Sequence, residues 1–170
     1  MFDPRGNQDP NNYERQGLRG GKIYKGPIGW TGHGLSVLDK YDGGNNTWLG
    51  MTGNTPGEWC VAYHGTNIQF AQSILITKLK AGGRQAYSGD DDINHPGQKV
   101  GDRVYVTPEI EIAEGYSTSI NGYKFVFMIR VNPKNLRIPK TNNKTNNVYW
   151  IVSGHSNDIR SYRLFIKYVG

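Results

Sequence analysis

The 170-residue sequence contains a single cysteine, Cys60, and no long hydrophobic run. One cysteine cannot form an internal disulfide, which excludes a disulfide-stabilised secreted scaffold. A membrane-spanning helix needs about 20 consecutive apolar residues, and no stretch approaches that length. Residues 1–5 also lack the basic and apolar regions of a signal peptide. We therefore expect an intracellular protein, cytoplasmic or nuclear, that does not act at a membrane.

Clustered charge of one sign is absent too. The formal net charge of +6 favours acidic partners in principle, but the 20 lysines and arginines are scattered, with no run of five or more. This distribution favours an ordinary basic surface over a nucleic-acid-binding patch. Acidic residues gather at Asp90, Asp91 and Asp92 with His95 nearby, yet this spacing matches no common zinc or calcium pattern. We expect no metal site.

The sequence is rich in aromatic residues and glycine: it has 11 tyrosines, 5 phenylalanines, 4 tryptophans and 23 glycines. The length fits one domain with a real core, and the glycines predict many loops. Residues 1–22 contain few large apolar groups, so we expect a flexible N-terminal tail. We expect residues 23–170 to form the single domain. Within it, residues 23–58 are predicted to be an irregular lobe held by Trp30, Trp48 and Trp59.

Regular structure is predicted from residue 59 onward. The helical spacing of apolar residues predicts a helix that starts near Thr66 or Asn67 and stops before residue 82. A second helix should follow Thr107, with Thr107 as its cap and Pro108 at its first position. Residues 80–102 form a long polar loop, which is usually functional or mobile. Strands are predicted over residues 59–63, 103–106, 123–131, 148–152 and 162–169. The fold class is α+β: a mixed or antiparallel sheet with a helix or two against it.

Two groups of residues suggest chemistry. His64 and Gly65 stand at the end of a predicted strand, where glycine lets a ligand approach the backbone and histidine can bind its polar groups. Tyr105 and Tyr116 are eleven positions apart, so a strand–turn–helix path can set two phenol rings across a gap. Each group has a plainer interpretation, a surface histidine at a turn and a pair of core tyrosines.

Together these motifs resemble the catalytic domain of the poly(ADP-ribose) polymerase-like (diphtheria-toxin-like) ADP-ribosyltransferases. The resemblance rests on the Tyr-His-Gly-Thr of residues 63–66, the Gly-Asp-Arg-Val-Tyr-Val-Thr-Pro of 101–108 and the Ala-Glu-Gly-Tyr of 113–116. Residues 148–152 and 158–164 are similar to the closing strands of that family, so the likeness spans about residues 59–169. It implies the split mixed or antiparallel sheet of that fold, with a few short helices.

The resemblance also implies roles for individual residues, with NAD⁺ as co-substrate. His64 would bind the ribose next to adenine, Gly65 would pair through its backbone with the nicotinamide carboxamide, and Thr66 would supply a nearby hydroxyl. Tyr105 and Tyr116 would enclose the nicotinamide ring between them. The phosphates need donors or cations, and we suggest Arg84 and Lys99 from the long loop.

The chain departs from the family pattern at two positions. Tyr149 aligns with the glutamate that polarises a ribose hydroxyl and activates the acceptor; a one-residue slip puts Val148 there instead. Ala113 stands where the family often has a serine that binds the carboxamide. With the carboxylate lost, chain elongation is not expected. The resemblance therefore implies His64, Tyr105 and Tyr149 as the catalytic set.

Two hypotheses follow. In the first, the chain is a mono-ADP-ribosyltransferase that moves one ADP-ribose from NAD⁺ to a protein or nucleic-acid acceptor and releases nicotinamide. In the second, the same fold is catalytically inactive and binds NAD⁺, ADP-ribose, a protein or a nucleic acid. We expect a monomer. For Cys60 a buried small hydrophobic role is favoured over a nucleophile, and His33 and His155 are expected at the surface.

Overall fold

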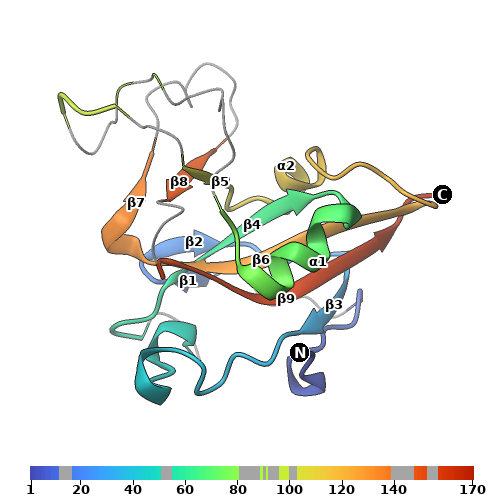
Figure 1. Cartoon of the computed structure of the whole chain (residues 1–170), viewed down its shortest axis with the longest axis horizontal. Coiled ribbons are helices and arrows are strands. Elements are labelled where there is room, and N and C mark those ends of the chain that lie inside the picture. The colour runs from blue at the N-terminus through green and yellow to red at the C-terminus, as the bar shows by residue number, and fades with distance from the viewer. Residues whose placement is uncertain are drawn as a thin grey trace.

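A computed structural model of the chain describes residues 1–11, 17–50, 55–80, 89, 91, 96–99, 103–138, 148–152 and 157–170. At the centre is a four-stranded antiparallel sheet with the order β3-β9-β6-β4. Its strands are β3 (Thr31–Gly34), β4 (Cys60–Thr66), β6 (Tyr123–Val131) and β9 (Ile159–Tyr168). The prediction of an α+β class is confirmed, because the described sheets are antiparallel and the helices are few (Figure 1).

Strand β6 is buried on both of its faces. Its alternation sends Phe127 and Ile129 into one hydrophobic cluster and Val126 and Met128 into another, as the sequence predicts. Residues 125–131 are all buried, and all of them except Arg130 are apolar, as expected for a strand covered on both sides. The central sheet therefore has a core on each side.

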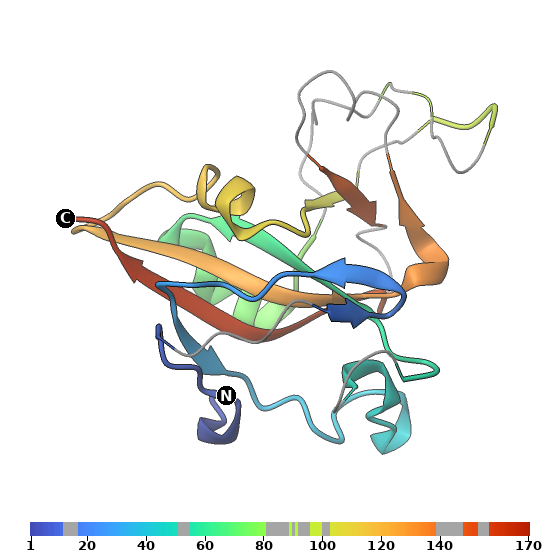
Figure 2. The ribbon, with the colours of Figure 1, turned by 180° about the vertical axis from the view of Figure 1, so that it is seen from behind.

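The two cores are covered by different elements. Helix α1 (Ile68–Thr77) lies on one face of the sheet, and the hairpin of β1 (Gly17–Arg19) and β2 (Lys22–Tyr24) lies on the opposite face (Figures 1 and 2). A small sheet of order β5-β8-β7 adds to the α1 side, and helix α2 (Ile110–Glu114) adds to the hairpin side. The small sheet consists of β5 (Val104–Val106), β7 (Leu136–Arg137) and β8 (Trp150–Val152).

The hairpin turn requires glycine. Gly20 and Gly21 have φ of +57° and +79°, the left-handed conformation that a tight two-residue turn demands. A Cβ on Gly20 would also overlap the backbone between Trp59 and Cys60. The hairpin is therefore pressed against the start of β4.

Residues 1–11 differ from the predicted flexible tail, because they lie along the edge strand β3. The short 3₁₀ helix η1 (Pro4–Gly6) is flanked by backbone bridges from Phe2 to Leu35 and from Gln8 to Gly32. Arg163 of β9 donates to the Gly6 carbonyl at 2.7 Å and to the Gln8 side chain at 2.8 Å. Backbone pairing and the partly buried Arg163 guanidinium thus hold a segment that has little apolar surface of its own.

The described residues of the predicted irregular lobe, 23–50 and 55–58, contribute to the core. Trp30 and Trp48 are both buried, but they pack on opposite sides of the central sheet, and β3 from this region is one of its strands. This region also contains two short 3₁₀ helices, η2 (Asp42–Gly44) and η3 (Thr47–Leu49), which are too short to produce a periodic pattern in the sequence.

Helix α2 begins later than predicted. Its first residue is Ile110 and its N-cap is Glu109, so Thr107 and Pro108 precede the helix. The Thr107 hydroxyl instead accepts the Glu109 N–H at 3.2 Å. Thr107 also exchanges two backbone hydrogen bonds with Tyr63, which keeps its backbone extended and delays the helix.

The 3₁₀ helix η4 (Pro133–Asn135) follows β6. No helix in the described part of the chain has the length and hydrophobicity to cross a bilayer.

Candidate functional site

His64 connects the two sheets. It lies in β4 of the central sheet, and its Nδ1 is 2.9 Å from the carbonyl oxygen of Tyr105 in β5. A carbonyl only accepts hydrogen bonds, so Nδ1 carries the proton and Nε2 keeps a lone pair. Burial lowers the pKa of His64, although the hydrogen bond to Tyr105 opposes the shift. At neutral pH the site thus presents an uncharged imidazole that accepts a hydrogen bond through Nε2.

This imidazole faces a pocket of about 420 Å³ between α1 and β5. A volume of this size lies within the range of small-molecule sites. Thr66 and Ser73 add hydroxyls to the lining, Lys78 and Lys80 add cations, and Phe70 adds an aromatic ring that is 53% exposed. The pocket therefore combines a flat apolar surface with hydrogen-bonding and cationic groups.

The backbone N–H and C=O of Gly65 lie on the edge of β4 that faces away from β6. Tyr63 exchanges hydrogen bonds of 2.7 and 3.0 Å with Thr107, so its N–H and C=O point away from β6. Two residues further along an antiparallel strand, the backbone groups point the same way. The N–H and C=O of Gly65 therefore face away from Val126, its partner in β6, and toward the same side as those of Tyr63.

The same position requires the absence of a side chain. A Cβ on Gly65 would overlap the carbonyl oxygen of Ala113 and come 3.2 Å from the Cβ of Tyr116. Helix α2 and Tyr116, two residues beyond its end, thus lie so close to the backbone of β4 that only glycine fits at position 65. The sequence motif at residues 63–66 reflects this close packing.

Tyr116 contacts Tyr149. Tyr116 lies just after α2 and is 59% exposed, whereas Tyr149 immediately precedes β8 and is buried. Their hydroxyls are 2.9 Å apart, and the rings meet edge to face with centroids 6.3 Å apart. The structure thus places Tyr105 with His64 in the pocket, and Tyr116 beside Gly65 and against Tyr149.

No family model and no curated protein sequence matches this chain.

Sequence patterns did not identify several of the residues that line the His64 pocket. Phe70 and Ser73 share one face of α1 because they are three residues apart, and the exposed aromatic ring is the signal that could have identified them. Lys78 ends α1 in a left-handed conformation with φ of +73°. Neither lysine of the pocket belongs to a recognisable motif, so only the three-dimensional arrangement places them there.

Neither of the residues suggested for phosphate binding, Arg84 and Lys99, lines the His64 pocket as far as the structure describes them. Lys99 is paired with Asp91 at 2.7 Å, and both side chains are exposed. Arg84 lies outside the described residues, as do Asp90, Asp92 and His95. Among the residues that are described, no three His, Cys, Asp or Glu side chains form a group that could hold a metal ion.

Cys60 is a buried core residue. Its thiol donates to the Gly20 carbonyl at 3.1 Å, and burial raises the pKa of the Cys60 thiol to about 11. A thiolate is the reactive form of cysteine, so the nucleophile interpretation is excluded at neutral pH.

His33 is half-buried in β3 and contacts the ring of Phe2, while His155 lies outside the described residues.

Proposed function

We propose that this chain is an NAD⁺-dependent mono-ADP-ribosyltransferase with an ADP-ribosyltransferase-like fold. The observation that supports this most directly is the neutral imidazole of His64, which lines a pocket of about 420 Å³ next to a glycine whose backbone groups face away from β6. A ribose hydroxyl donates to Nε2. The pocket beside it accommodates adenosine, with Phe70 positioned for stacking against a base.

Gly65 suits the other end of the dinucleotide. A carboxamide has one acceptor and one donor side by side, and an extended residue offers the complementary N–H and C=O pair. Tyr116 beside Gly65 supplies a ring against which the nicotinamide packs. The side chain of Ala113 offers no hydrogen bond, so the backbone pair carries the recognition of the carboxamide.

The proposed reaction replaces one bond to the ribose with another. The bond between the anomeric carbon and nicotinamide breaks, its electron pair leaves with the neutral nicotinamide, and positive charge builds up on the ribose. A heteroatom of the acceptor then bonds to the anomeric carbon and releases a proton. Holding both ends of NAD⁺ lowers the barrier by fixing the orientation of this bond.

Tyr149 limits the reaction to a single transfer. It offers a hydroxyl where the resembled family has a carboxylate, and that hydroxyl is 2.9 Å from the Tyr116 hydroxyl. A carboxylate stabilises developing charge and activates a ribose hydroxyl as acceptor. Without it, the ribose of an attached ADP-ribose is a poor acceptor, so chains do not extend.

The same contact supports a second candidate function. The two tyrosine hydroxyls share a hydrogen bond, so one donor and one acceptor of the pair are used within the protein. A catalytically inactive module that holds NAD⁺ or ADP-ribose, or binds a protein or nucleic acid, would need only the pocket and the backbone pair.

Radiolabelled NAD⁺ separates the two functions. The chain is incubated with labelled NAD⁺ and cell extract, label on protein and RNA is counted, and NAD⁺ affinity is measured by calorimetry. We expect label in single units, and we expect His64→Ala to lose both label and affinity, at least tenfold. His33→Ala is the matched control, because it removes a histidine from β3 and should change neither readout.

The other outcomes are also informative. Binding that depends on His64 without any transfer would favour the binding module. If the parent chain neither binds NAD⁺ nor transfers label, the transferase and the NAD⁺-binding module are both refuted, and of the two functions only the binding of a protein or a nucleic acid is left. Label that persists in His64→Ala would refute the assigned site.

A further inference from the structure

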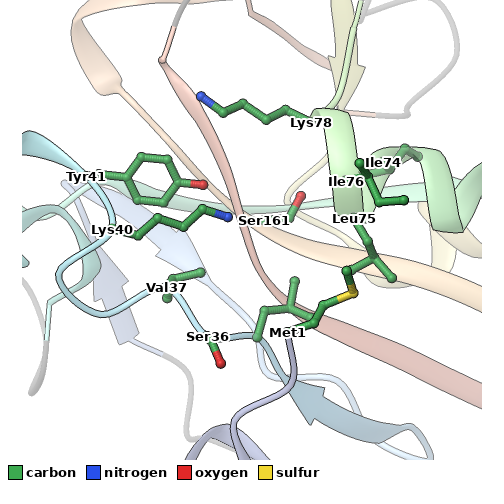
Figure 3. A pocket seen from close by; sticks show the side chains of 11 residues that line it. Met1, Ser36, Val37, Lys40, Tyr41, Ile74, Leu75, Ile76, Lys78 and Ser161 are labelled. Atoms are coloured by element: carbon green, nitrogen blue, oxygen red, sulfur yellow. The ribbon is translucent and has the colours of Figure 1, made fainter.

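A second pocket, of about 370 Å³, lies between α1 and the segment that follows β3 (Figure 3). It shares Ile74 and Lys78 with the His64 pocket, and its other lining residues are different. Its apolar part is formed by aliphatic side chains of both segments, among them Leu35, Val37 and Leu75. Nothing in the proposed NAD⁺ reaction uses this pocket.

Cations gather around Tyr41 at this pocket. The ammonium groups of Lys40 and Lys78 lie 5.6 and 5.5 Å from the centre of the Tyr41 ring, and the Arg160 guanidinium lies 4.5 Å from it. Asp42 is the carboxylate that pairs with Arg160, at 2.8 Å. Within the described part of the chain, neither lysine forms an ion pair; Lys78 donates to the Asn157 amide oxygen at 2.8 Å. The local charge is therefore positive, with two ammonium groups available to an anion.

Hydroxyl groups lie beside these cations. Figure 3 shows the Lys40 ammonium and the hydroxyls of Tyr41 and Ser161 directed into the same space. Burial raises the pKa of Tyr41, against the opposing effect of Arg160, so the phenol keeps its proton and can donate. Ammonium and hydroxyl donors that converge beside an aliphatic surface suit a ligand with one anionic end and one apolar end.

We propose that this second pocket binds a small amphiphilic carboxylate. The aliphatic body lies on Leu35, Val37 and Leu75, and the carboxylate lies between Lys40 and Lys78, with hydrogen bonds from Tyr41 and Ser161. The two lysines carry point charges on flexible stems, so each ammonium group can approach an oxygen of the carboxylate. The volume is near the lower end for small-ligand sites, so a medium-length chain fits better than a long one.

Octanoate is the probe, titrated into the full chain by calorimetry. Two control ligands separate its features: 1-octanol has the apolar body alone, and acetate has the carboxylate alone. We expect octanoate to bind at least tenfold more tightly than either. If 1-octanol binds as well as octanoate, the site recognises only the apolar body; if acetate does, it recognises only the carboxylate. Either result overturns the proposal.

Charge-neutral variants test the location. Lys40→Gln should weaken octanoate binding at least fivefold, because Lys40 lines only this pocket. Lys25→Gln is the matched control: it removes the same charge from an exposed lysine just after β2, and it should leave the affinity unchanged. Ser161→Phe, which fills the pocket, should abolish binding. Equal affinities in the parent chain, Lys40→Gln and Ser161→Phe would refute the site, and this result would not depend on NAD⁺.

Discussion

At Gly65 the fold leaves room for a hydrogen atom but not for the Cβ of any other residue. Its backbone lies against the Ala113 carbonyl, so Gly65→Ala forces α2 away from β4. Overpacking of this kind costs about 1–3 kcal/mol. We expect urea unfolding of Gly65→Ala to show a loss of that size.

The control for this substitution is Gly17→Ala. Gly17 is also in a strand, but no atom lies within 4 Å of the position that its Cβ would take. The free energy of unfolding of Gly17→Ala should equal that of the parent chain or exceed it. An equal loss in both variants would mean that the close approach of Ala113 to β4 does not limit stability.

Residue identity predicted some parts of the site better than others. His64 and Gly65 stand together at a strand end, and the structure explains both, one by its bond to Tyr105 and the other by its contact with Ala113. Phe70 and Lys78 could not be chosen from sequence, because their role depends on the way α1 lies beside β5. Tyr149 was singled out only by resemblance, and its contact with Tyr116 depends on long-range folding.

At the scale of elements, Arg160 fastens the segment of η2 and η3 to the start of β9. Its guanidinium lies 4.1 Å from the centre of the Trp59 ring and 4.8 Å from that of Trp48, and it makes two hydrogen bonds of 2.8 Å with Asp42. These hydrogen bonds and the charge of Arg160 lower the pKa of Asp42. Through these contacts Arg160 forms a joint, meaning that it holds together two segments that are far apart in the sequence.

Arg160→Lys tests this joint. Lysine keeps the charge but has neither the planar face nor the paired donors, so most of the stacking and one hydrogen bond are lost. We expect unfolding to become easier by about 2 kcal/mol, the size of a desolvated cation–π interaction. Arg5→Lys is the control, because Arg5 pairs with Asp3 at the surface, and its urea midpoint should match that of the parent chain. A parental midpoint for Arg160→Lys would contradict the role of the joint.

Elements with local signals were predictable, and those held by distant partners were not. The alternation in β6 and the helical spacing in α1 follow from short-range patterns, and both were found close to their predicted positions. Residues 1–11 lack such a pattern; backbone bridges to β3 and the Arg163 guanidinium place them. The start of α2 was misplaced because Thr107 pairs with Tyr63, a contact 44 positions away along the chain.

At the scale of the whole molecule, the two sheets meet at the end of β4. Tyr63 and His64 hold Thr107 and Tyr105 through backbone and imidazole hydrogen bonds. The two pockets are adjacent near the end of α1, since Ile74 and Lys78 line both of them. The junction between the sheets thus supports the imidazole that the proposed NAD⁺ site requires.

This junction should make the stability of the molecule sensitive to mild acid. The pKa of His64 is lowered from its ordinary value near 6.5, so the unfolded chain binds this proton more readily than the folded chain. The stabilising effect is complete above pH 6.5 and is lost as the pH falls from there toward the folded pKa. We expect the free energy of unfolding in urea to decrease between pH 7.5 and pH 5.5, roughly the range in which histidine changes charge.

His64→Asn isolates this effect. The asparagine amide can donate to the Tyr105 carbonyl in place of Nδ1, but it does not titrate. The decrease between the two pH values should therefore be smaller in His64→Asn than in the parent chain, whereas His33→Asn should retain it in full. Asp42 does not interfere, because its pKa is lowered and its own loss of stability falls at a more acidic pH than this range. Were His64→Asn to lose as much stability as the parent chain, the imidazole would not be the proton-sensitive link between the two sheets.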